Sequence, residues 1–279
     1  MDGTMNPEDQ KFLNAFNRHF VSLCWVDCEI DSNGDAIKNP RIFCTSGFVI
    51  EYQCEWLWIT AGHLLNQLEN QLPKDNRRMV QSQFIAGWNP DEATVSHIPF
   101  DYGTCLKYYV DDDDEGTDLG IVFISEELKR AMSKAGVVPV HNLDLPEKEY
   151  DSYWVHGLPK KEQRDDIQQS EEGIDCAASV TPVVFRVSPL ESSTGGFLKT
   201  KRQRLYASVP AEVPLETLDG VSGGPIYAIK QEADRVDYHL AAVQNMERKS
   251  SKTIAACPSV LLHEILAKGF ADLQRRRDK

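Results

Sequence analysis

Short runs in which apolar and polar residues alternate make up most of this chain, and turn residues separate them. Alternation with a period of two places successive side chains on opposite faces of a strand. Two segments instead carry apolar residues at helical spacing, residues 6–20 and the stretch from Pro258 to Arg276. The pattern therefore predicts an all-β fold with a helix near each end. The expected strands are 20–30, 42–52, 55–60, 82–88, 94–98, 119–124, 153–155, 180–187, 205–209, 226–229 and 238–243.

Polar and charged stretches between these strands are expected to be loops. The most prominent are 160–175, 191–204 and the acidic run 111–115. Ser125, followed by Glu126 and Glu127, is typical of a helix start, because the hydroxyl caps a backbone N–H and acids favour the positive end of the helix dipole. This helix and the proline-containing segment that follows it indicate a boundary between two halves of the chain.

Charge and hydropathy narrow the class of protein. The chain of 279 residues carries 43 acidic and 30 basic residues, for a net charge of −13. Such a charge argues against a binder of nucleic acid or of an anionic membrane, because both functions need a basic face. No apolar run approaches the ~18 residues of a membrane span, and residues 1–20 lack the apolar region of a secretory signal.

The cysteines agree with an intracellular setting. There are seven of them, an odd number, and none lies at C-x-x-C spacing. This distribution argues against a disulfide framework and against a compact zinc site. We therefore expect a cytoplasmic protein with neither a metal ion nor a cofactor.

The stretch Gly220-Val221-Ser222-Gly223-Gly224-Pro225 carries the first candidate chemistry. Small neighbours let the backbone turn sharply around a serine and let a substrate carbonyl approach it. The N–H groups of Gly220 and Ser222 can then converge on a developing oxyanion. The alternatives are an ordinary tight turn and the G-x-S-x-G elbow of α/β-hydrolases. The elbow fits poorly, because it needs its acid and histidine downstream and helices between its strands.

A nucleophilic serine also needs a base to take its proton and an acid to orient that base. His63 lies at the end of an apolar strand, behind the small residues Ala61 and Gly62. Asp118 opens the apolar run 119–124, where an unpaired carboxylate would be costly. The two residues lie far from each other and from Ser222 in the sequence, so only a tertiary fold can bring them together.

Taken together, Thr60-Ala61-Gly62-His63, the run from Asp118 to Val122 and the Ser222 stretch resemble the trypsin-like, chymotrypsin-fold serine peptidases. The order of histidine, aspartate and serine agrees with that family. The resemblance implies that His63 is the general base, Asp118 its orienting acid and Ser222 the nucleophile. It also implies an oxyanion hole formed by the Gly220 and Ser222 N–H groups.

The same resemblance implies two six-stranded antiparallel β-barrels with the triad between them. Residues 20–125 would form the first barrel and 151–257 the second, joined by a linker at 126–150. Residues 1–19 would be an N-terminal helical segment and 258–279 a C-terminal helix. His63 and Asp118 would then come from the first barrel, and Ser222 from the second.

Departures from the family pattern refine this expectation. Val221 stands where secreted digestive members carry an aspartate, and Leu64 stands where they carry a cysteine. The chain is therefore more similar to the bacterial, HtrA-like intracellular branch than to the secreted digestive enzymes. Glu216 lies six residues before Ser222, where trypsin has its acidic specificity residue. With Thr217 it implies a preference for lysine or arginine at the cleaved position, the alternative being that both are exposed loop residues.

The sequence thus predicts a serine endopeptidase that acts on a protein or peptide substrate and that a partner protein regulates. A function of another class is the alternative, namely a catalytically silent trypsin-like fold that binds or senses proteins. Presence of all three triad residues does not by itself distinguish the two.

Overall fold

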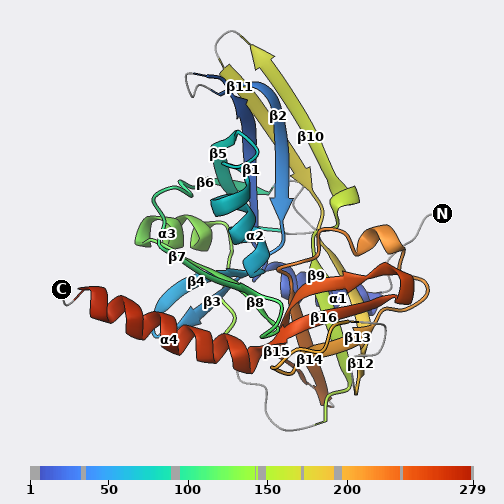
Figure 1. Ribbon diagram of the computed structural model, residues 1–279. Coiled ribbons are helices and arrows are strands. Elements are labelled where there is room, and N and C mark those ends of the chain that lie inside the picture. The colour runs from blue at the N-terminus through green and yellow to red at the C-terminus, as the bar shows by residue number, and fades with distance from the viewer. Residues whose placement is uncertain are drawn as a thin grey trace.

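The computed structural model describes residues 7–32, 36–88, 95–141, 143, 149–170, 173–191, 197–232 and 235–277. Strands from the second half of the chain close into an antiparallel six-stranded barrel (Figure 1). Its interior is filled by small and β-branched side chains, among them Val155, Ile226 and Ile254. The six-stranded barrel expected for this half is confirmed. In barrel order its strands are β12 (Val183–Leu190), β13 (Leu205–Ser208), β16 (Thr253–Pro258), β15 (Arg235–Arg248), β14 (Pro225–Glu232) and β9 (Ser152–Gly157).

The first half forms two four-stranded antiparallel sheets, and an isolated bridge between Phe20 and Phe48 joins them. The expected second closed barrel is not confirmed, since the described residues form one closed barrel only. One sheet has the order β2 (Ala36–Thr45), β1 (Ser22–Ile30), β5 (Arg77–Ala86) and β6 (Ser96–Pro99). The other has the order β3 (Phe48–Tyr52), β4 (Glu55–Thr60), β8 (Thr117–Phe123) and β7 (Lys107–Asp112).

The single strand expected at 42–52 is wrong. The chain leaves the first sheet after Thr45 and enters the second at Phe48. Ser46 and Gly47 make this break, because the Ser46 hydroxyl bonds to the second half of the chain. Gly47 lies so close to the indole of Trp58 that an added Cβ would overlap the ring.

The helices expected near the two ends of the chain and after Ser125 are present, and a short helix that was not predicted packs against β7 and β8 (Figure 1). They are α1 (Pro7–Asn17), the short α2 (Gly62–Asn66), α3 (Glu126–Lys134) and α4 (Ser259–Arg277). Ser125 caps α3 as predicted, since its hydroxyl accepts a hydrogen bond from the Leu128 N–H. Within the described ranges, no helix is both long enough and apolar enough to cross a lipid bilayer.

The largest apolar core joins the two halves. Phe16 of α1 stacks on Tyr227 of β14, with ring centroids 4.3 Å apart. Leu262 of α4 is fully buried in the same cluster as Leu119 of β8 and Val243 of β15. Burial of several large side chains, each stabilising by about 1.5–3 kcal/mol, fixes the two halves against each other.

The predicted loop at 160–175 is also wrong. It is a two-stranded hairpin of β10 (Gln163–Ser170) and β11 (Gly173–Val180), which extends from the body beside β2 (Figure 1). Strand β10 contains one apolar residue, Ile167, so its sequence has no period of two, whereas β11 has an apolar or small residue at every second position from Ile174 to Val180. At its base, the buried Ala178 and Val180 belong to the same apolar cluster as Leu158 and anchor the hairpin.

One pair of cysteines corrects the expectation from cysteine spacing. Cys24 of β1 and Cys44 of β2 lie directly opposite each other, and their sulfur atoms are bonded at 2.19 Å. Sequence spacing could not reveal this pair, because the strand register brings the two residues together. The thiols of Cys28, Cys54, Cys105 and Cys257 are free.

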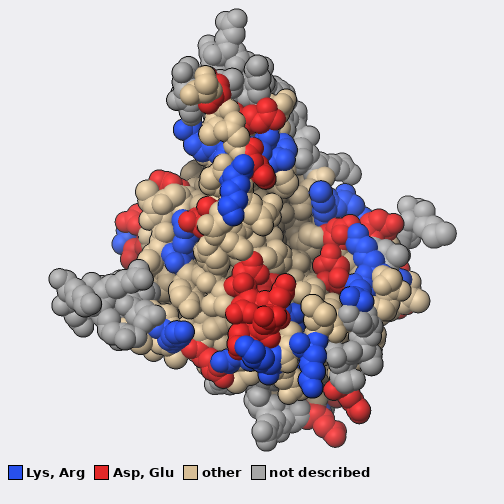
Figure 2. Space-filling model, in the orientation of Figure 1, with Lys and Arg blue, Asp and Glu red and all other residues tan. Residues whose placement is uncertain are grey.

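The acidic run at 111–115 ends β7 and turns into β8, and a basic segment of the second half covers it. The N–H groups of Lys201 and Arg202 donate to the carbonyl oxygens of Asp114 and Glu115, and Lys201 Nζ lies 2.7 Å from the Glu115 carboxylate. Figure 2 shows acidic side chains gathered over the β7–β8 turn, with basic side chains beside them. We name the contact between residues 111–115 and 200–204 the acidic clasp.

Two histidines are buried between α1, β9 and the linker. His19 Nδ1–H donates to the Val138 carbonyl oxygen at 2.6 Å, and its Nε2 accepts from the Tyr238 hydroxyl at 2.7 Å. Burial lowers the pKa of His19 from 6.5 to about 4. His156 is fully buried, neither of its ring nitrogens bonds to a described residue, and burial lowers its pKa to about 3. Both side chains are therefore neutral in the folded protein.

We predict that the free energy of unfolding falls as the pH is lowered from 6.5 toward 4, and that it is unaffected by these groups above 6.5. The reason is that the unfolded chain binds protons that the folded chain excludes from His19 and His156. Each histidine contributes a slope of about 1.4 kcal/mol per pH unit within this window. Denaturant unfolding at about pH 7, 6 and 5 measures the slope. His19→Gln should remove one histidine's share, and an unchanged slope in this variant would contradict the prediction.

Candidate active site

Close backbone packing positions His63. Strand β4 ends at Thr60, and α2 begins two residues later at Gly62. A Cβ on Gly62 would overlap the Val110 carbonyl oxygen of β7 and lie 2.9 Å from the Leu119 nitrogen of β8. Only glycine allows so close an approach. The next residue, His63, is therefore held directly against the start of β8.

Asp118 of β8 receives two hydrogen bonds from His63. Its Oδ1 accepts from the His63 backbone N–H at 2.8 Å, and its Oδ2 lies 2.7 Å from Nδ1 of the ring. An ionised carboxylate only accepts hydrogen bonds, so Nδ1 carries the proton and Nε2 keeps its lone pair. The Asp118 side chain is 8% exposed and the His63 side chain 37% exposed. The imidazole is thus oriented by a buried carboxylate while part of its side chain remains exposed.

The surroundings of His63 favour its protonated form. Burial by itself would lower the pKa of His63, but the hydrogen bond and negative charge of Asp118 outweigh it, and the pKa is raised above 6.5. Asp111 and Glu247 add further negative charge. A ring that takes up a proton at this position would be stabilised by the same carboxylate that orients it.

Ser222 lies in a tight turn before β14. The Gly224 N–H donates to the Val221 carbonyl oxygen at 3.0 Å, and Gly223 has φ of +90°. A positive φ at the third position is the requirement of a type II turn, and glycine meets it without strain. Strand β15 holds the turn, because the carbonyl oxygen and N–H of Gln244 bond to Gly223 and Gly224 at 2.7 and 2.9 Å.

Val221 anchors this turn in the barrel core. Its side chain is fully buried and belongs to the apolar cluster inside the barrel. A Cβ on Gly157 of β9 would come within 2.8 Å of the Val221 side chain. Val221, which stands where secreted digestive peptidases carry an aspartate, is therefore an apolar side chain that fixes the turn in the barrel core.

Ser46 and Thr60 connect the histidine side of the site to the serine side. The Ser46 hydroxyl donates to the Gly220 carbonyl oxygen at 2.9 Å and accepts from the Leu158 N–H at 2.8 Å. The Thr60 hydroxyl donates to the Ser46 carbonyl oxygen at 2.8 Å. A Cβ on Gly223 would overlap both Thr60 and Ser46. The turn that carries Ser222 thus packs directly on the residues that precede His63.

The structure therefore brings the three predicted triad residues to one place, but it does not complete the triad. Among the described residues, no hydrogen bond joins the Ser222 hydroxyl to His63. The N–H groups of Gly220 and Ser222 donate to no group in the described part of the chain. Neither N–H group is thus engaged by a described residue, so both are available to a hydrogen-bond acceptor outside this part of the chain.

The residues expected to set specificity lie before this turn. Thr217 is buried and Glu216 is exposed, both on a 3₁₀ turn (Leu215–Thr217). Asp219 is paired with Lys249, at 2.6 Å between Oδ2 and Nζ. Glu247 of β15 was not predicted, because only the strand pairing places it near His63. Burial and the charge of Asp219 raise the pKa of Glu247.

No protein-family model matches this chain, and no curated protein sequence matches it. The case for a function therefore rests on the geometry of the site itself.

We predict that Asp118→Asn lowers the pKa of His63. The substitution removes the charge and the hydrogen bond that raise this pKa, while the burial that lowers it remains. Titration of the His63 ring protons by NMR measures the shift. Asp75→Asn, at an exposed position, serves as the control and should leave the His63 pKa unchanged.

We also predict that Ser46→Ala lowers the free energy of unfolding by about 1–3 kcal/mol, because it leaves the buried Leu158 N–H and the half-buried Gly220 carbonyl oxygen without their partner. Denaturant unfolding measures the loss. Ser133→Ala in α3, whose hydroxyl is exposed, should change the free energy by about 0.5 kcal/mol or less. Equal effects of the two substitutions would show that the Ser46 hydroxyl does not hold the halves together.

Proposed function

We propose that this protein is a serine endopeptidase of the chymotrypsin-like type, which hydrolyses peptide bonds through a His63–Asp118–Ser222 triad. The observation that carries the proposal is the double hydrogen bond from His63 to the buried Asp118, beside a glycine-bounded serine turn. A histidine seated in this way has one fixed tautomer and a free Nε2. In this proposal, the two four-stranded sheets of the first half correspond to the first barrel of that fold.

The proposed reaction uses only groups of this chain. Ser222 Oγ attacks the scissile carbonyl carbon as His63 Nε2 takes the hydroxyl proton, and Asp118 stabilises the resulting imidazolium. The tetrahedral oxyanion accepts hydrogen bonds from the Gly220 and Ser222 N–H groups. The C–N bond then breaks, and His63 gives its proton to the leaving amine. Water activated by His63 hydrolyses the ester to Ser222 and restores the free enzyme.

Carboxylates near the serine turn support a substrate with a basic side chain. Glu216 is exposed, and Glu247 lies close enough to raise the pKa of His63. Asp219, by contrast, is neutralised by Lys249. The preference for lysine or arginine at the cleaved position stays a prediction, and Glu247 is a second carboxylate that could serve it.

A second function is favoured by one observation, the missing hydrogen bond between His63 and Ser222. A silent fold that binds or senses proteins needs no such bond. A peptidase that a partner protein activates would form it only in the complex, since catalytic hydrogen bonds are often long in free enzymes. Both alternatives predict low activity for the isolated chain, and they differ in whether any partner elicits activity.

We predict that a fluorophosphonate probe labels the wild-type protein at Ser222. Ser222→Ala should abolish labelling, and Asp118→Asn should slow it by about 10³-fold or more, because the histidine loses its orienting acid. The labelling rate should rise with pH through the raised pKa of His63, above 6.5, since only the neutral ring accepts a proton.

Ser133→Ala is the matched control for this experiment and should be labelled like the wild type. Labelling is measured for the isolated chain and again in the presence of cell extract, to include an activating partner. Absence of Ser222-dependent labelling in both conditions would reject the peptidase and favour the binding module.

A further inference from the structure

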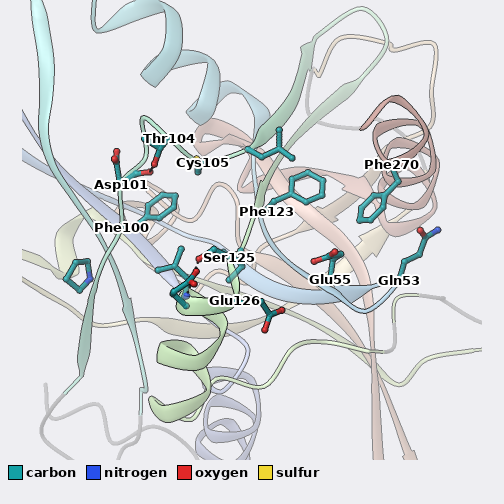
Figure 3. Close-up of a pocket in the computed structure, with 15 residues that line it drawn as sticks. Gln53, Glu55, Phe100, Asp101, Thr104, Cys105, Phe123, Ser125, Glu126 and Phe270 are labelled. Atoms are coloured by element: carbon teal, nitrogen blue, oxygen red, sulfur yellow. Dashed lines mark hydrogen bonds between the residues drawn. The ribbon is translucent and has the colours of Figure 1, made fainter. Parts of the chain in front are cut away.

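A hollow of about 700 Å³ opens on the first half of the chain, away from the candidate triad (Figure 3). It lies between the turn before β4, the connection from β6 to β7, the start of α3 and the end of α4. This volume falls within the range of protein sites that bind ligands. Its principal lining residues are Glu55, Phe100, Asp101, Phe123, Glu126 and Phe270.

The hollow lies at one end of β4 and β8, and His63 and Asp118 lie at the other end. Phe123 ends β8, whereas Asp118 lies near its other end. At about 3.3 Å per residue, the two residues are about 16 Å apart along the strand. The hollow is therefore a separate feature, and the inference drawn from it does not rest on the proposed peptidase activity.

Aromatic side chains form the floor of the hollow. The rings of Phe123 and Phe270 lie 5.4 Å apart, and Phe270 also contacts Tyr52 at 5.1 Å. Both phenylalanines are only partly buried, and the neighbouring Leu106 is 42% exposed. Apolar side chains gathered in a concave surface favour a partner that covers them, because burial removes their surface from water.

Negative charge surrounds this floor. Four acidic residues line the hollow, and no lysine or arginine whose side chain the structure describes does so. Figure 3 shows Asp101 on one side of Phe123 and Glu55 on the other, with Glu126 below. In the described part of the chain, no basic side chain forms an ion pair with Glu55 or Asp101. The site therefore presents uncompensated negative charge around an apolar centre.

The neighbouring lysines do not neutralise this charge. Lys129 reaches Glu126 only at 3.9 Å and lies over the Trp56 ring. Lys107 is directed to Glu69, at 3.1 Å, and to the Tyr102 carbonyl oxygen. Neither lysine therefore pairs with Glu55 or Asp101, the carboxylates on opposite sides of the hollow.

We propose that the hollow is a docking site for a segment of a partner protein in which lysine or arginine residues flank apolar side chains. A single small cation can pair with one carboxylate, but the carboxylates lie on opposite sides of the floor. A peptide segment spans that separation, places an apolar side chain on Phe123 and directs cationic groups to both sides. Guanidinium groups suit the site best, because they pair with carboxylates and also stack on aromatic rings.

The test measures binding of a fluorescein-labelled peptide of alternating arginine and leucine, six residues long, by anisotropy. All proteins carry Ser222→Ala, so that no cleavage of the probe can occur. Combined Glu55→Gln, Asp101→Asn and Glu126→Gln should weaken binding about tenfold or more, because three counter-charges are lost. The matched control combines Asp75→Asn, Asp114→Asn and Glu191→Gln, which remove the same charge at exposed positions elsewhere, and should weaken binding by less than about threefold.

A second arm separates apolar docking from simple charge attraction. A peptide with serine in place of leucine should bind about tenfold more weakly, and Leu106→Asn should weaken binding of the leucine peptide. Equal effects of the two triple variants, or equal binding of the serine peptide, would overturn the proposal. Tighter binding of a peptide with the sequence of residues 271–279 would also overturn it, because the occupant would then be the basic end of this chain.

Discussion

The Ser46 hydroxyl bonds to two backbone groups of the second half of the chain, Gly220 and Leu158, where the candidate site lies. Ser46 itself stands in the gap between β2 and β3, and its carbonyl oxygen is held by Thr60. One short connection of the first half thus fixes the entry to the Ser222 turn and the residue after β9. The Ser46 side chain is fully buried, and its hydroxyl donates one hydrogen bond and accepts another. A buried backbone group left without a hydrogen-bond partner would lower the free energy of unfolding by about 1–3 kcal/mol.

Glycine makes close backbone contacts possible both between the halves, at Gly223, and within the first half, at Gly62. Gly223 leaves no space for a side chain against Thr60 and Ser46, and Gly62 leaves none against Val110. The backbone of the serine turn therefore lies against the strand end before His63, and the backbone at His63 lies against β7 and β8. The apolar core that contains Leu119 and Val243 also holds the two halves of the chain together. Positions of His63, Asp118 and Ser222 are thereby set by backbone packing rather than by long side chains.

Local patterns in the sequence predicted those parts of the fold that local forces determine. Strand β4 has the predicted bounds, Glu55–Thr60, because its apolar side chains face two cores. The contact between His63 and Asp118 followed from motifs that each lie at a strand end. The break at Ser46 was missed because its hydrogen-bond partners lie far away in the sequence, at Leu158 and Gly220.

The hairpin of β10 and β11 was missed for a different reason, namely that β10 is polar except for Ile167 and the alternation of β11 begins only at Ile174. The Cys24–Cys44 pair and the nearness of Glu247 to His63 depend on strand register, which spacing along the chain does not reveal. The closed form of the second barrel was expected from the family resemblance. That same resemblance did not foresee that the first half forms two open sheets.

The anchoring of Val221 limits how the serine turn can be controlled. A buried valine in the barrel core has no charge to gain or lose, so no ion pair at this position can switch the turn. Charged contacts do occur on the surface between the two halves of the chain. The acidic clasp is one of them, since it joins the second half to the turn that directly precedes Asp118. The exposed ion pairs of the acidic clasp are individually weak, and salt weakens them further. Its two backbone hydrogen bonds join uncharged groups, so salt affects them less. Under the proposed function, the acidic clasp therefore links the second half of the chain to the strand that carries Asp118 and not to the serine turn.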